Sequence, residues 1–134
     1  MARLEVELPA SADAARVARE QLHDHIPPMS GETQRENALL LTTELVTNAI
    51  RHGALSTDDR IRLVVENADS TLRISIVQPT PASGVTVARA AHTPSPDRVV
   101  PGGLGLVIVD ELADRWGIDV GPPGCVWFEL KIPG

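Results

Sequence analysis

The chain of 134 residues is 43% hydrophobic and 22% charged, which is enough for one domain with a real core but hardly for two. Its formal net charge of −6 argues against a nucleic acid or an anionic membrane as the main partner, because both bind basic surfaces. The single Cys125 excludes an internal disulfide, and the sequence shows neither a signal peptide nor an apolar run of about 18 residues, so we expect one cytoplasmic domain over residues 1–134 with no membrane contact.

The N-terminal part of the chain predicts one strand and two helices. Residues 3–8 alternate polar and apolar side chains, the pattern of a half-buried strand. Residues 12–25 show a helical pattern that ends before two prolines. Ser30 is placed to cap a second, longer helix, which runs to His52 and is stopped by Gly53.

The middle of the chain predicts a hairpin followed by a long loop. Residues 61–65 and 72–77 alternate as strands do, and residues 66–71 between them are typical of a turn. Residues 79–101 contain five prolines and no sustained periodicity. Loops of this length are uncommon in compact domains and often serve as lids or binding loops, although a tolerated disordered insertion would leave the same pattern.

The C-terminal part predicts a glycine-led helix and a closing hairpin. Residues 102–105 read Gly-Gly-Leu-Gly and precede a helical pattern that ends near Trp116 and Gly117. Residues 118–120 and 125–132 then flank a turn rich in glycine and proline. The free N–H groups at the start of a helix attract phosphate oxygens, and glycines allow close approach. A glycine-rich turn that merely caps a helix would look the same, and the segment is neither a P-loop nor a dinucleotide fingerprint.

The long helix carries a polar stripe inside a segment that is otherwise apolar. Glu44, Asn48 and His52 follow one another at four-residue spacing, so they lie one above another along one edge of the apolar arc. A carboxylate and an amide oxygen one turn apart are suited to holding a hydrated divalent cation. Alternatively, Glu44 and Asn48 form a solvated flank, and Arg51 and His52 are cations favoured at a helix C-terminus. No nucleophilic triad or histidine metal site is evident.

Taken in order, the helix with its carboxylate and amide, the two strands, the long loop and the glycine-led helix resemble the GHKL ATPase superfamily, whose members share the Bergerat ATP-binding fold. Residues 44–52, 102–117 and 126–130 are similar to the stand-alone anti-sigma-factor serine kinases and related regulatory ATP-binding proteins of actinobacteria. The resemblance covers essentially the whole chain. It implies an α+β, two-layer sandwich in which a mixed, mostly antiparallel sheet of about five strands carries three helices on one face and a long ATP-lid loop.

The resemblance also implies a site that binds ATP with Mg²⁺. Asn48 would coordinate Mg²⁺, Glu44 would be the general base, and His52 would face the phosphates or the lid. Gln78 stands where the family has an adenine-binding aspartate, and its amide would accept a hydrogen bond from N6 of adenine and donate one to N1. The nucleotide-binding residues implied in this way are Asn48, His52, Gln78, Gly103, Leu104, Gly105 and Leu106.

Three functions are compatible with these features. The first, implied by the resemblance, is an ATP-dependent protein serine kinase and anti-sigma factor that switches between a sigma factor and a STAS-type anti-sigma factor antagonist, and that could form a homodimer. The second is a degenerate, pseudokinase-like regulatory binding module with weak or no ATP binding, suggested by Gln78 and Leu104. The third, the catalytic domain of a sensor histidine kinase, is disfavoured because the chain contains no phosphoacceptor helix pair.

Overall fold

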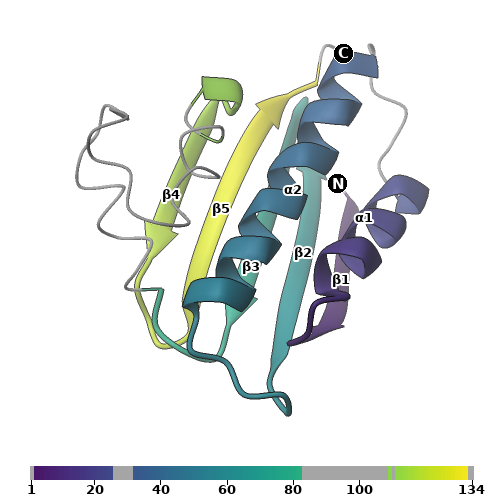
Figure 1. Cartoon of the computed structure of the whole chain (residues 1–134). Helices are drawn as coiled ribbons and strands as arrows, with labels where there is room; N and C mark the ends of the chain where they lie inside the picture. The colour runs from purple at the N-terminus through teal and green to yellow at the C-terminus, as the bar shows by residue number, and fades with distance from the viewer. Residues whose placement is uncertain (1, 26–31, 83–108, 110, 133–134) are drawn as a thin grey trace.

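The computed structural model describes residues 2–25, 32–82, 109 and 111–132. Five strands form one sheet in the order β1-β2-β3-β5-β4, and α1 and α2 cover the same face of it (Figure 1). In chain order the elements are β1 (Ala2–Pro9), α1 (Ala14–His25), α2 (Glu32–His52), β2 (Arg60–Ala68), β3 (Thr71–Gln78), β4 (Arg115–Asp119) and β5 (Gly124–Lys131). This arrangement confirms the predicted two-layer α+β fold with five strands.

The described sheet is antiparallel throughout, whereas a mixed, mostly antiparallel sheet was predicted. Between β1 and β2 the chain passes through two helices rather than one. The path from strand to helix to helix to strand reverses the chain three times, and an odd number of reversals leaves β2 antiparallel to β1. The single helix of a βαβ unit would have left the two strands parallel.

The predicted third helix ends earlier than expected. The N–H of Ala113 donates to the carbonyl of Val109 over 2.8 Å and closes its last turn, while the start of this helix lies outside the described residues. Trp116 and Gly117, which were predicted to end the helix, belong to β4 instead. The prediction was wrong because Asp114 already donates its N–H to a β5 carbonyl, so pairing with β5 overrides the helical pattern.

The turn between β2 and β3 is tighter than the six residues predicted for it. Asp69 and Ser70 alone form the turn, and their φ angles of 53° and 63° lie in the left-handed region. A two-residue turn with both φ angles positive matches the right-handed twist of the strands it joins. Ala68 therefore pairs directly with Thr71, and both strands extend further than their apolar alternation indicates.

The core lies between the helices and one face of the sheet. Alternate residues of the central strands point to this face and are buried, because successive side chains of a strand point to opposite faces. Neither described helix combines the length and apolar composition needed to cross a bilayer. The largest fully buried apolar side chains are Leu8, Leu22, Leu41, Val46, Ile61, Leu63, Leu72, Ile74, Val109, Phe128 and Leu130.

No described helix covers the other face of the sheet (Figure 1). The guanidinium of Arg73 lies 4.0 Å from the ring centroid of Trp127 and 3.4 Å from Glu129. The ring passes so close to Gly117 that a Cβ there would come within 2.7 Å of it. Burial raises the pKa of the Cys125 thiol on this face, so the thiol is protonated and weakly nucleophilic at neutral pH.

One buried polar group in α2 has no hydrogen-bond partner. The side chain of Thr42 has no exposed surface, and its Oγ1 is the only such unpaired atom among the described residues. An unsatisfied buried hydroxyl costs free energy, since it has lost its bonds to water. We therefore expect Thr42→Val to raise the free energy of unfolding by about 1 kcal/mol, measured by urea denaturation.

Thr43→Val is the matched control for this substitution. Thr43 is the next residue of the same helix, and its Oγ1 donates to the carbonyl of Leu39 over 2.9 Å. The same chemical change there removes a formed hydrogen bond, so no gain in stability is expected. A loss of stability in Thr42→Val as large as that in Thr43→Val would show that the Thr42 hydroxyl is paired in solution.

Candidate functional site

The polar stripe of α2 lies where the buried arc of the helix meets its exposed side. Leu41, Leu45 and Ala49 fix the helix on the sheet, and all three are buried. Asn48 lies next to this arc and is only 7% exposed, whereas Glu44 is half-buried. His52, one turn beyond Asn48, is exposed at the C-terminal end of the helix. The three predicted residues thus share one edge of α2, with burial greatest at the amide.

This edge of α2 faces away from α1. The guanidinium of Arg35 donates to the carbonyl of His23 at the end of α1 over 2.7 Å, which marks the side of α2 that meets α1. Glu44 follows Arg35 by nine residues, so it points about 180° around the helix from it. The stripe therefore lies on the opposite side of α2, away from the α1 contact.

The side chains of Glu44 and Asn48 are not paired with any described residue. No described side chain or backbone group forms a hydrogen bond or ion pair with either of them. A surface carboxylate needs no partner, but an amide as buried as that of Asn48 loses most of its contact with water. A hydrogen bond from a ligand, or coordination of a hydrated cation, would stabilise an amide in this position.

Gln78 lies at the end of β3, on the face of the sheet that the helices cover. Its side chain is 4% exposed, and its Nε2 donates to Thr80 Oγ1 and to the carbonyl of Pro81, each over 3.0 Å. Thr80 Oγ1 in turn donates to the carbonyl of Gly53 at the end of α2. Both amide hydrogens of Gln78 are therefore engaged within the chain, and the predicted donation to N1 of adenine is not available in this arrangement.

The backbone ties the same region to the turn between β4 and β5. The N–H of Gly124 donates to the carbonyl of Thr80 over 3.0 Å, and the N–H of Ala82 donates to the carbonyl of Val120 over 2.9 Å. Thr80 and Gly53 were not predicted as site residues. Gly53 was interpreted only as a helix stop, and nothing in the sequence around Thr80 signals a contact with a residue 27 positions away.

Among the described residues, no group of three or more histidine, cysteine, aspartate and glutamate side chains is placed to hold a metal ion. A Mg²⁺ ion commonly takes one or two protein ligands and completes its shell with water and phosphate oxygens. The amide oxygen of Asn48, unpaired and nearly buried, fits such a shared site, with Glu44 one turn away.

A family model described as a histidine kinase-like ATPase domain matches residues 8–128. The chain belongs to this family. The predicted resemblance to the GHKL superfamily is thereby confirmed. The match spans both described helices, β2, β3 and β4 in full, together with the end of β1 and the first part of β5. No curated protein matches the sequence significantly.

Solved structures also match the fold of this histidine kinase-like ATPase domain. One is the crystal structure of the RsbU and RsbW domains of Rv1364c from Mycobacterium tuberculosis, with a TM-score of 0.72 and 19% sequence identity. The match covers 98% of the present chain and 33% of the other, so the chain spans about a third of that protein's length. At this level of identity the likeness shows a shared fold.

Part of the site predicted for this histidine kinase-like ATPase domain lies outside the described residues. This applies to Gly103, Leu104, Gly105 and Leu106 at the glycine-led turn, and to most of the predicted lid. The described residues of that region are residues 79–82 at its start and the final turn of the helix that follows it. The structure thus places Glu44, Asn48, His52 and Gln78 but not the predicted phosphate-binding turn.

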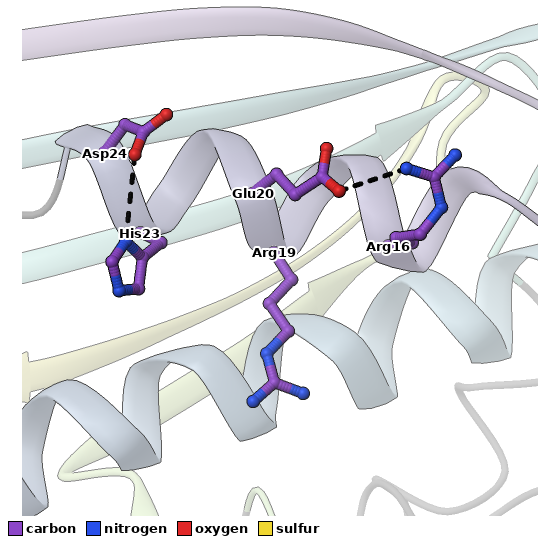
Figure 2. Close-up of a pocket in the computed structure, with 5 residues that line it drawn as sticks. All are labelled: Arg16, Arg19, Glu20, His23 and Asp24. Carbon is purple, nitrogen blue, oxygen red and sulfur yellow. Dashed lines mark hydrogen bonds and ion pairs between the residues drawn. The ribbon is translucent and has the colours of Figure 1, made fainter.

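The surface of this histidine kinase-like ATPase domain also carries an open hollow that belongs to α1 alone. Figure 2 shows its five lining side chains, which project from one helix and are largely paired with one another. Arg16 lies 3.0 Å from Glu20 and 3.8 Å from Asp13, and His23 lies 3.7 Å from Asp24. These pairs are exposed and contribute little stability. None of the predicted site residues lines this hollow.

Proposed function

We propose that this domain binds ATP together with Mg²⁺ beside the exposed edge of α2. The observation that carries the proposal is the pairing of a nearly buried, unpartnered Asn48 with Glu44 one turn away, in a histidine kinase-like ATPase domain. Asn48 would contribute an amide oxygen to Mg²⁺, and His52 would lie near the phosphates. Gln78, at the end of β3, would contact the adenine ring, and the turn at residues 103–106 would bind the phosphates.

We further propose that the domain is a protein serine kinase and anti-sigma factor. The fold is shared with a structure that contains the RsbU and RsbW domains of Rv1364c, and this likeness is compatible with the proposed activity. Its partners would be a sigma factor and a STAS-type antagonist, and residues 1–134 would act in the cytoplasm as one domain, able to form a homodimer. The acidic net charge of −6 is consistent with protein partners rather than with direct contact to DNA.

The chemistry at the site would be transfer of a phosphoryl group to a serine hydroxyl. ATP would supply the γ-phosphoryl group and leave as ADP, and Mg²⁺, when bound, would offset the negative charge on the phosphate oxygens. The carboxylate of Glu44 would accept the proton of the attacking serine hydroxyl, and Asn48 would hold the metal. Because phosphoryl transfer depends mainly on positioning and charge, these groups and the backbone donors of the glycine-led turn form a sufficient minimal set.

Two measurements test this proposal. Titration calorimetry of the purified domain with ATP should show binding in the presence of Mg²⁺ and much weaker binding in the presence of EDTA. Incubation with γ-labelled ATP and a STAS-type antagonist should then label a serine of that partner. Absence of ATP binding at millimolar concentration would contradict the proposal and favour the degenerate regulatory module. ATP binding without phosphate transfer would support the nucleotide site but contradict the kinase activity.

A further inference from the structure

The side-chain amide of Gln78 is fixed in one orientation by three neighbouring groups. Nε2 lies 3.0 Å from Thr80 Oγ1 and 3.0 Å from the carbonyl oxygen of Pro81. Thr80 Oγ1 also lies within hydrogen-bond distance of the carbonyl oxygen of Gly53. Gln78 is only 4% exposed, so these contacts compete little with bulk water.

The chemistry of these groups allows only one direction for each hydrogen bond. The carbonyl of Pro81 only accepts, so the group that faces it must be the amide nitrogen. The carbonyl of Gly53 also only accepts, so the single hydrogen of the Thr80 hydroxyl is used there. Thr80 Oγ1 can then only accept from Gln78, which requires the nitrogen again. Two independent acceptors thus hold the nitrogen side of the amide.

The oxygen of the same amide is left without a donor. No described residue donates a hydrogen bond to Gln78 Oε1. Gly53 directly follows α2 and lies beside the amide. A Cβ there would come within 3.3 Å of Oε1 and 3.1 Å of Nε2, so the missing side chain leaves space beside the amide.

We propose that Thr80 is a specificity-determining residue, which orients the amide of Gln78 so that it acts toward the nucleobase only as a hydrogen-bond acceptor. The inference rests on the proposed function, in which Gln78 contacts the base. An acceptor matches the 6-amino group of adenine and repels the 6-oxo group of hypoxanthine or guanine. A glutamine whose amide could rotate by 180° would bind either base. The selection therefore comes from Thr80 and Pro81, not from Gln78 alone.

The first part of the test uses the protein without nucleotide. In ¹⁵N-labelled protein the side-chain NH₂ signals of Gln78, identified by their loss in Gln78→Glu, should exchange slowly with solvent. Thr80→Val, which keeps the shape but removes the hydroxyl, should make this exchange at least about tenfold faster. Thr80→Ser keeps the hydroxyl and should restore slow exchange. Equal exchange in Thr80→Val and the parent chain would overturn the proposed orientation.

The second part measures base selectivity by calorimetry with Mg²⁺ and either ATP or inosine triphosphate, which has an oxo group where ATP has the amino group. The parent chain should bind ATP at least about tenfold more tightly. Thr80→Val should lower this ratio several-fold, whereas Thr80→Ser and the exposed control Thr57→Val should keep it. An unchanged ratio in Thr80→Val would overturn the inference alone, while binding of neither nucleotide to the parent chain would overturn the proposed function as well.

Discussion

Replacing Asn48 with alanine should weaken Mg²⁺-dependent ATP binding by about 10- to 100-fold, because the substitution removes the amide oxygen that is proposed to coordinate the metal. The protein should remain folded. The amide makes no bond to a described residue, so its removal takes away a nearly buried polar group without breaking an internal contact. Calorimetry with ATP, in Mg²⁺ and in EDTA, measures the effect, and a thermal melt without nucleotide measures the stability.

Asn37→Ala provides the control for this experiment. Asn37 is on the same helix, eleven residues earlier, which corresponds to about 16 Å along the helix axis. The chemical change and the gain in helix propensity are the same as in Asn48→Ala. ATP binding should be unaffected in Asn37→Ala. If Asn48→Ala bound Mg-ATP as tightly as the parent chain, Asn48 would not be the metal ligand.

Replacing Glu44 with glutamine should have the opposite profile, with binding kept and transfer lost. Glutamine preserves the shape of the side chain but cannot accept the proton of the attacking hydroxyl at neutral pH. Loss of a positioned general base lowers the rate of such a step by roughly 10² to 10⁴-fold. Single-turnover transfer of labelled phosphate to the partner protein measures the rate, and calorimetry measures ATP binding in the same preparation.

Glu36→Gln is the matched control, since Glu36 is an exposed carboxylate of the same helix. It changes the net charge of the domain by the same amount and should leave both the rate and the binding unchanged. A Glu44→Gln variant that transferred phosphate at the parent rate would remove Glu44 from the mechanism. A variant that lost ATP binding as well would instead place Glu44 among the groups that hold the metal.

Much of the fold was predictable because its elements follow local rules. The boundaries of β1, α1 and α2 fall within about two residues of prediction, since alternation, prolines and the stop at Gly53 act over short distances. The errors occur where pairing between segments distant in the sequence decides which secondary structure forms. The local sequence around Trp116 and Gly117 is compatible with the end of a helix or with a strand. Only the pairing with β5 selects the strand.

The candidate site divides in the same way. Glu44, Asn48 and His52 were predictable as a group because one helix fixes their relative positions. The bonds of Gln78 were not predictable, because they join the end of β3 to a turn and to the end of α2, and the sequence does not encode which donors face which acceptors. Thr80 stands between two prolines, and its proposed role becomes visible only in the structure, where its hydroxyl donates to the carbonyl of Gly53.

The position of the three proposed site residues on a single helix also bears on how this domain changes in evolution. Substitutions along α2 alter one side chain at a time, but insertion or deletion of one residue between Glu44 and Asn48 would rotate one group relative to the other by about 100°. Such a change would also turn Leu45 or Leu41 out of the core. The length of this helix segment is therefore constrained by stability and, in the proposed function, by chemistry as well.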